Sequence, residues 1–208
     1  MRGPYDRNEP SVRGGTTTDA ELIESSLREP ERFAVLYDRH HQMVHRYIAR
    51  RLGRDLADDL MADTFLVAFR RRERYDLTRS DARPWLYGIA TTLVGQHHRE
   101  ESRFWRFIAR TGVDHVVEFP GDQVADRVSA QGLRRELAAA LAKLPRGQRD
   151  VLLLTAAGGL TTEEIASALG IAKGTVHSRL SRARKRTGDV LGGADPREIN
   201  EEFVHERA

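Results

Sequence analysis

The segment from Lys173 to Arg186 has the residue types that bind nucleic acid. It contains six lysine and arginine residues and no acidic residue. Arginine side chains bind phosphates and the major-groove edge of guanine through paired hydrogen bonds. At helical spacing, Val176 and Leu180 form an inward apolar stripe, which leaves the basic and hydroxyl side chains facing outward. The residues predicted to contact DNA are Lys173, Thr175, His177, Ser178, Arg179, Arg182 and Arg184.

The residues before this segment have the pattern of a helix-turn-helix. Thr161 and Glu164 have the spacing of a capping box at the start of a helix. Ile165 and Ala166 face inward, and Gly170 has the conformational freedom that a tight turn requires. A basic second helix on this scaffold is suited to the major groove. The alternatives are a solvated basic face and a helix-turn-helix that binds only protein. The capping box, the turn glycine and the basic outer face together favour DNA binding.

Metal binding and catalysis are the other functions for which the sequence was searched. His41 and His45 lie four residues apart, beside His40, and could bind a metal from one helix face. No carboxylate completes a zinc-hydrolase motif, however, and no phosphate-binding loop, dinucleotide-binding loop or nucleophile motif is found. The sequence has no cysteine, which excludes a thiolate zinc site or disulfide within it. We therefore predict that the chain is not an enzyme and has no catalytic residue, metal or cofactor.

The elements that position these side chains are predicted to be helices. Apolar residues recur at three- and four-residue steps over residues 31–52, 55–72 and 85–94, and again from residue 133. A polar loop ending at Pro84 separates the second and third of these segments. We predict an all-α fold of two small helical domains joined by a flexible linker. The C-terminal one is predicted to be a four-helix domain that contains the helix-turn-helix.

Charge is segregated along the chain, although its net charge is only +3. Residues 39–110 carry fifteen arginines and nine acids, and residues 131–186 carry eleven basic residues and four acids. Two basic blocks indicate two modules that face a polyanion. A solubilising surface of mixed charge would explain the total charge but not its segregation along the chain. The predicted organisation is a disordered tail over 1–28, a helical domain over 29–106, a linker over 107–130, a helix-turn-helix domain over 131–190 and an acidic tail over 191–208.

No apolar run approaches the roughly 20 residues that span a bilayer. The N-terminal residues also lack the apolar stretch of a secretory signal. We expect a soluble cytoplasmic protein without membrane insertion.

Two parts of the chain resemble the extracytoplasmic-function (ECF) sigma factors, within the sigma-70 family of bacterial RNA polymerase sigma subunits. Residues 144–186, LPRGQRDVLLLTAAGGLTTEEIASALGIAKGTVHSRLSRARKR, resemble the C-terminal domain of that family. Three further stretches resemble the first domain of that family and follow one another in the correct order. They are FAVLYDRHHQMVHRYIARRL, DLADDLMADTFLVAFRR and RYDLTRSDARPWLYGIATTLVGQHHR. The resemblance covers about residues 30–188.

The resemblance implies a protein that binds core RNA polymerase and directs promoter-specific initiation. The Lys173–Arg186 helix would recognise the −35 element as duplex, and the first domain would recognise and melt the −10 element. The implied partners are the β′ clamp helices and β subunit of core polymerase, promoter DNA and an anti-sigma protein. The alternative is a stand-alone helix-turn-helix regulator, which would usually carry a dimerisation or ligand-binding domain instead.

The resemblance also implies roles for residues of the first domain. The residues placed on the polymerase-binding segment are Asp58, Asp59, Leu60, Asp63, Thr64 and Phe65. Without the resemblance, the aspartates would be explained by the helix dipole and solubility. The residues placed at the −10 element are Tyr75, Asp76, Thr78, Arg79, Ser80, Arg83, His97 and Arg99. Trp85 heads an apolar stripe and is expected in the core, while Thr92 and Gln96 replace the Asn and Asp usual in the family.

Overall fold

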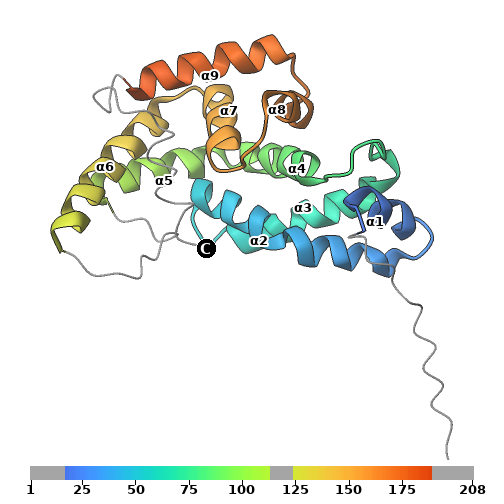
Figure 1. Ribbon diagram of the computed structural model, residues 1–208. Coiled ribbons are helices and arrows are strands. Elements are labelled where there is room, and N and C mark those ends of the chain that lie inside the picture. Colours follow the sequence, from blue (N-terminus) through green and yellow to red (C-terminus); the bar gives the residue numbers. More distant parts are fainter. Residues whose placement is uncertain (1–16, 113–123, 189–208) are drawn as a thin grey trace, which may run out of the picture.

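The computed structural model describes residues 17–112 and 124–188, which form helices and no strands (Figure 1). The helices are α1 (Asp19–Ser26), α2 (Phe33–Leu52), α3 (Ala57–Arg71), α4 (Arg83–Gln96), α5 (His98–Thr111), α6 (Val124–Lys143), α7 (Arg146–Ala156), α8 (Thr162–Leu169) and α9 (Lys173–Gly188). Two short 3-10 turns, η1 (Pro30–Arg32) and η2 (Arg72–Arg74), precede α2 and follow α3. The predicted all-α fold is confirmed. No helix in these ranges has the length and apolar character needed to cross a membrane.

The first domain, α1–α5, is organised around α2. Leu36, Val44 and Ile48 recur at four- and eight-residue steps on this helix and are fully buried, as expected for a core-facing stripe. This stripe packs against α3, α4 and α5. The helix ends at Gly53, whose φ of 86° lies in the left-handed region that glycine adopts without strain.

Helix α1 lies inside the segment predicted to be a disordered tail, so that prediction is wrong for residues 19–26. Thr18 and Glu21 form a capping box at its start, which satisfies backbone donors that a short helix otherwise leaves unpaired. Leu22 and Ile23 are buried against the first domain. Tertiary packing therefore stabilises a helix too short to persist alone. Residues 1–16 of the predicted tail lie outside the described residues.

The second domain, α6–α9, contains the four helices that were predicted. Leu141, Val151, Leu154, Ile165 and Val176 form its buried centre. Both neighbouring helices extend into the predicted linker, because α5 continues to Thr111 and α6 begins at Val124. Residues 113–123 of that linker and the predicted acidic tail lie outside the described residues.

The two domains pack directly against each other rather than standing apart. Helix α6 lies along α5, and α8 lies against α4 (Figure 1). The second contact brings the helix-turn-helix onto the helix that follows the loop predicted to recognise the −10 element. The arrangement of the domains therefore bears directly on the candidate site.

Candidate nucleic-acid and polymerase interface

The predicted helix-turn-helix is formed by α8 and α9. The Glu164 carboxylate accepts the Thr161 backbone N–H at 2.7 Å, and the Thr161 hydroxyl accepts the Glu164 N–H at 3.3 Å. Gly170 ends α8 with a φ of 62°. Buried Val176 and Leu180 anchor α9. The capping box, the turn glycine and the inward stripe are all confirmed.

The outward face of α9 differs in detail from the predicted DNA-contacting set. Lys173, His177 and Arg182 are exposed, whereas Thr175, Ser178, Arg179 and Arg184 are half-buried. The exposed polar side chains that the sequence analysis missed are Ser181, Lys185 and Arg186. They lie at helical steps from Arg182 and Ser178, so the spacing already contained the signal.

Several cations of α9 have partners within the domain. Lys173 forms an ion pair with Glu163 of α8 at 2.8 Å, and Arg186 donates to the Gln148 side chain at 3.3 Å. The Arg179 guanidinium lies against Gly147 at the start of α7. Exposed ion pairs are weak, so Lys173 can exchange Glu163 for a phosphate at little cost.

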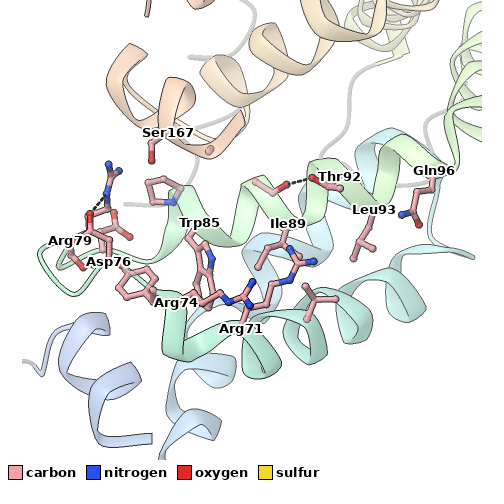
Figure 2. Close-up of a pocket in the computed structure, with 16 residues that line it drawn as sticks. Arg71, Arg74, Asp76, Arg79, Trp85, Ile89, Thr92, Leu93, Gln96 and Ser167 are labelled. Atoms are coloured by element: carbon pink, nitrogen blue, oxygen red, sulfur yellow. Dashed lines mark hydrogen bonds and ion pairs between the residues drawn. The ribbon is translucent and has the colours of Figure 1, made fainter. Parts of the chain in front are cut away.

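A pocket of about 510 Å³ lies between the loop before α4, α4 itself and the end of α3 (Figure 2). Arg71, Arg74 and Arg79 bring three guanidinium groups to it. Trp85 packs against the core and also lines the pocket, where its ring lies 4.9 Å from that of Tyr75. Trp85 is partly buried against the core and also faces the pocket, so the prediction that it belongs to the core is confirmed only in part. The pocket also includes Thr92 and Gln96, the two positions that depart from the family pattern, as well as Ile89 and Leu93.

Five of the residues predicted to bind the −10 element, Tyr75, Asp76, Thr78, Arg79 and Ser80, lie on the loop before α4, but not all of them face solvent. Tyr75 is buried, and its hydroxyl donates to the Arg79 carbonyl at 2.8 Å. Burial, followed by the charge of Asp19, raises the pKa of Tyr75 to about 12, so its hydroxyl stays protonated. Asp76 accepts from the Thr78 hydroxyl at 2.7 Å and pairs with Arg79. Tyr75 therefore supports the loop, and its neighbours shape the rim.

The remaining residues of that set lie on the rim or beyond it. Ser80 is exposed, and Arg83 forms an ion pair with Asp81 at 2.7 Å. His97 is half-buried at the junction of α4 and α5, and Arg99 is exposed in the first turn of α5. These two residues lie past Gln96, at the far end of the pocket.

The predicted polymerase-binding residues divide into an exposed and a buried group. Asp58, Asp59 and Asp63 are exposed on α3. The buried residues are Leu60, Thr64 and Phe65. Their side chains hold α3 on the domain and do not contribute to its surface. Leu66, which is 44% exposed, continues the outward face of α3 and was missed, although it lies three residues after Asp63.

The histidines considered as metal ligands make other contacts. His40 is buried 2.7 Å from Asp19, and His45 lies 3.3 Å from Asp58. His41 contacts backbone carbonyls of its own helix. Within residues 17–112 and 124–188, no three potential ligands are grouped around one point.

Two glycines of α4 form the contact with the second domain. A Cβ atom at Gly88 would collide with the backbone carbonyl of Ala168 in α8, so only glycine permits this approach. A Cβ atom at Gly95 would overlap the Arg146 guanidinium. Ser167 and Ala168 of α8 consequently line the pocket beside α4 (Figure 2). The helix-turn-helix domain covers one side of the pocket.

Four charged residues form a buried ion network between the domains: Arg51 and Glu101 from the first domain and Arg149 and Asp150 from the second. Arg51 donates to Glu101 at 2.7 Å and to Asp150 at 2.6 Å. Arg149 lies 3.2 Å from the second oxygen of Glu101. Burial lowers the pKa of Arg149 and raises that of Asp150. Each buried charge faces an opposite one, which offsets part of the cost of removing the four charged groups from water.

Comparisons with known proteins agree with this two-part geometry. The family descriptions "Sigma-70 region 2" and "Sigma-70, region 4" match residues 36–104 and 134–187. The chain is 33% identical over 177 residues to the ECF RNA polymerase sigma factor SigL of Mycobacterium tuberculosis, covering 83% of this chain and 98% of the relative. It is 31% identical to the ECF RNA polymerase sigma factor BldN of Streptomyces coelicolor, covering 88% and 69%.

Two solved structures share the fold. One is CnrH in complex with the cytosolic domain of CnrY, with a TM-score of 0.57, 24% identity and coverage of 85% of this chain and 99% of the other. The second is RpoE in complex with the anti-sigma factor NepR from Bartonella quintana, with a TM-score of 0.50, 23% identity and coverage of 80% and 98%.

Proposed function

The chain belongs to the ECF RNA polymerase sigma factors, and we propose that it directs core polymerase to promoters through two separate DNA sites. The observation that carries this proposal is the presence, in one chain, of a basic recognition helix and a cation-rimmed pocket on a different domain. A stand-alone regulator would need only the first. No bond is made or broken by such a chain, so no catalytic residue is assigned.

The outer face of α9 is proposed to recognise the −35 element as duplex DNA. His177, Ser181 and Arg182 face outward from the part of the helix that would enter the major groove. Lys185 and Arg186 follow them and would contact phosphates. Because phosphate contacts release counterions, promoter binding should weaken steeply as salt concentration rises.

The pocket beside α4 is proposed to receive an unstacked base of the −10 element. A base that leaves the duplex needs a cavity and cations that hold its strand. The pocket provides about 510 Å³ and an aromatic surface at Trp85. Arg71, Arg74 and Arg79 lie where they can neutralise the phosphates of that strand.

The exposed face of α3 is proposed to bind the β′ clamp helices of core polymerase. Asp59 and Asp63 provide negative charge, and Leu66 provides an apolar anchor beside them. An interface of this kind combines an apolar centre with a charged rim that selects a basic partner. The helix-turn-helix domain would contact the β subunit, and a chain that works with core polymerase acts in the cytoplasm.

The packed domains represent a closed form that must open before the pocket is filled. A base in the pocket would meet Ser167 and Ala168 of α8, and Gly88 leaves no space between α4 and α8. Binding to core polymerase would separate the domains, because it engages each at a different site. An anti-sigma protein would favour the closed form if it bound both domains together, as a ligand shifts an equilibrium toward the state it prefers.

Two charge variants test the proposal with purified core polymerase. Arg182→Ala should lower initiation at −35-containing promoters roughly tenfold or more, the size expected for one DNA contact, and leave core affinity unchanged. Asp59→Arg should instead lower core affinity. Glu24→Arg, which makes the same kind of charge change at an exposed residue of α1, is the control for Asp59→Arg. A chain that binds promoter duplex tightly but supports no initiation with core polymerase would be a stand-alone regulator.

A further inference from the structure

One buried carboxylate joins α1 to the loop beside the pocket. Asp19, at the start of α1, is 4% exposed. Its Oδ2 accepts the Ala82 backbone N–H at 2.9 Å, and its own backbone N–H donates to the Ser80 carbonyl at 3.1 Å. Asp19 thus holds the loop at both sides of Asp81, the residue that pairs with Arg83.

The first domain fixes this carboxylate through two further donors. His40 of α2 contacts Oδ2 at 2.7 Å and is itself buried. Arg39 donates to Oδ1 at 2.7 Å. Burial opposes ionisation of Asp19, but the hydrogen bonds from His40 and Ala82 outweigh it and bring its pKa to about 2. The carboxylate is therefore charged at neutral pH and has a fixed orientation.

The loop has few other attachments of this kind among the described residues. Asp76 binds Thr78 and Arg79 within the loop, and the Tyr75 hydroxyl donates to the Arg79 carbonyl. These bonds give the loop its local shape but do not tie Ser80 and Ala82 to the rest of the domain. The contacts of Asp19 do so, next to the point where Arg79 and Asp81 line the pocket.

We propose that Asp19 is a positioning residue for recognition of the −10 element. It is too buried to touch DNA, and it acts by holding residues 80–82 so that the rim of the pocket keeps one geometry. Base preference at the −10 element would then depend on α1, which lies outside the region 2 match at residues 36–104. This inference rests on the proposed function.

The test is a selection of promoter DNA by holoenzyme from a library randomised at both promoter elements. The parent holoenzyme should enrich preferred bases in both. Asp19→Ala removes the acceptor of the Ala82 N–H and should reduce base preference at the −10 element roughly tenfold, as expected for a lost charge-assisted hydrogen bond. Preference at the −35 element should not change, a separation that a general loss of folding would not produce.

Three further variants distinguish the hydrogen bond from the stability of α1. Asp19→Asn keeps an oxygen for the Ala82 N–H and should retain −10 preference within about threefold. Glu21→Ala removes the carboxylate half of the α1 capping box but leaves the Asp19 contacts, and should preserve −10 preference. Arg39→Met removes the donor to Asp19 Oδ1, and the Arg39 side chain is 38% exposed. This variant should reduce −10 preference about two- to threefold. It provides a readout even if Asp19→Ala does not fold.

The outcomes separate this inference from the proposed function. Unchanged −10 preference in both Asp19→Ala and Arg39→Met overturns the inference. An equal loss in Glu21→Ala also overturns it, because the stability of α1 would then be the cause. A parent holoenzyme that enriches no bases in either element contradicts the proposed function itself.

Discussion

The outer face of α9 is open to solvent, whereas the pocket beside α4 is partly covered by α8 of the same helix-turn-helix domain. The helix-turn-helix domain therefore exposes its own proposed DNA site and partly covers the other proposed site. The α9 face can meet duplex DNA without rearrangement. In the proposed function α8 must move before the pocket is filled, so recognition of the −10 element would depend on a change in domain arrangement, whereas recognition of the −35 element would not.

The contacts that hold the cover suit reversible opening. The interdomain ion network contains charged groups that water solvates well, in contrast to an apolar interface. When the domains separate, Arg51 keeps Glu101 in the first domain, and Asp150 keeps Arg146 at 3.7 Å in the second. Arg149 loses Glu101 but keeps its hydrogen bonds to the carbonyls of Leu141, Ala142 and Leu144, which limits the cost of opening.

The largest expected effect comes from breaking this network at its centre. Arg51→Met retains most of the side-chain volume but leaves the Glu101 and Asp150 carboxylates without their shared partner. Removing one member of a buried ion pair costs about 3–5 kcal/mol. Urea denaturation should show a loss of that size in the free energy of unfolding. Small-angle scattering should show a larger radius of gyration as the domains separate.

Arg32→Met is the matched control for Arg51→Met. Arg32 also pairs with a glutamate, but both side chains are 54% exposed, so its loss should cost less than about 1 kcal/mol. Equal destabilisation by the two variants would show that the buried network has no special role in closing the pocket.

A smaller effect is expected from forcing α4 and α8 apart without removing a charge. Gly88→Ala places a methyl group against the Ala168 carbonyl and should shift the population toward the open form. If that shift is about 1.4 kcal/mol, the free chain should bind single-stranded −10 DNA about tenfold more tightly. Binding of −35 duplex should be unchanged. Fluorescence anisotropy with the two labelled DNAs measures both affinities.

Gly132→Ala is the control for Gly88→Ala, since a methyl group at Gly132 in α6 meets no atom within 4 Å. It should alter neither affinity. If Gly88→Ala weakened binding of single-stranded DNA, the contact between α4 and α8 would form part of the pocket rather than its cover.

The parts of the site that depend on neighbouring residues could be predicted from the sequence. The capping box at Thr161, the turn at Gly170 and the stripe through Val176 follow from short-range spacing. The cover over the pocket could not be predicted, because Arg51 and Asp150 are 99 residues apart. No local pattern distinguishes an arginine that meets a distant carboxylate from one that faces solvent.

The first domain shows the same limit of sequence-based prediction for the orientation of single side chains. Tyr75 and Phe65 were assigned to functional surfaces from their position in a family pattern, yet both are buried. A match to a pattern fixes the segment but not the direction of each side chain. Helix α1 was missed for a related reason, since Leu22 and Ile23 are too few to define a periodic stripe and are buried only by tertiary contact.

The smallest expected effect is a change in DNA affinity that has opposite signs at the two proposed DNA sites. Thr161→Ala removes the α8 capping box, which should cost about 1 kcal/mol of stability in the helix-turn-helix. A less ordered α8 supports α9 less well, so binding of −35 duplex should weaken a few-fold. The same change loosens the cover over the pocket, so binding of single-stranded −10 DNA should strengthen.

Thr162→Ala, one residue along, leaves the capping box intact and serves as the control. Both affinities are measured for each variant at one salt concentration, because electrostatic binding to DNA varies strongly with salt. A parallel loss at both sites in Thr161→Ala would mean that α8 supports the pocket as well as α9. Opposite changes would mean that the ordering of one short helix sets the balance between an open duplex-binding face and a covered pocket.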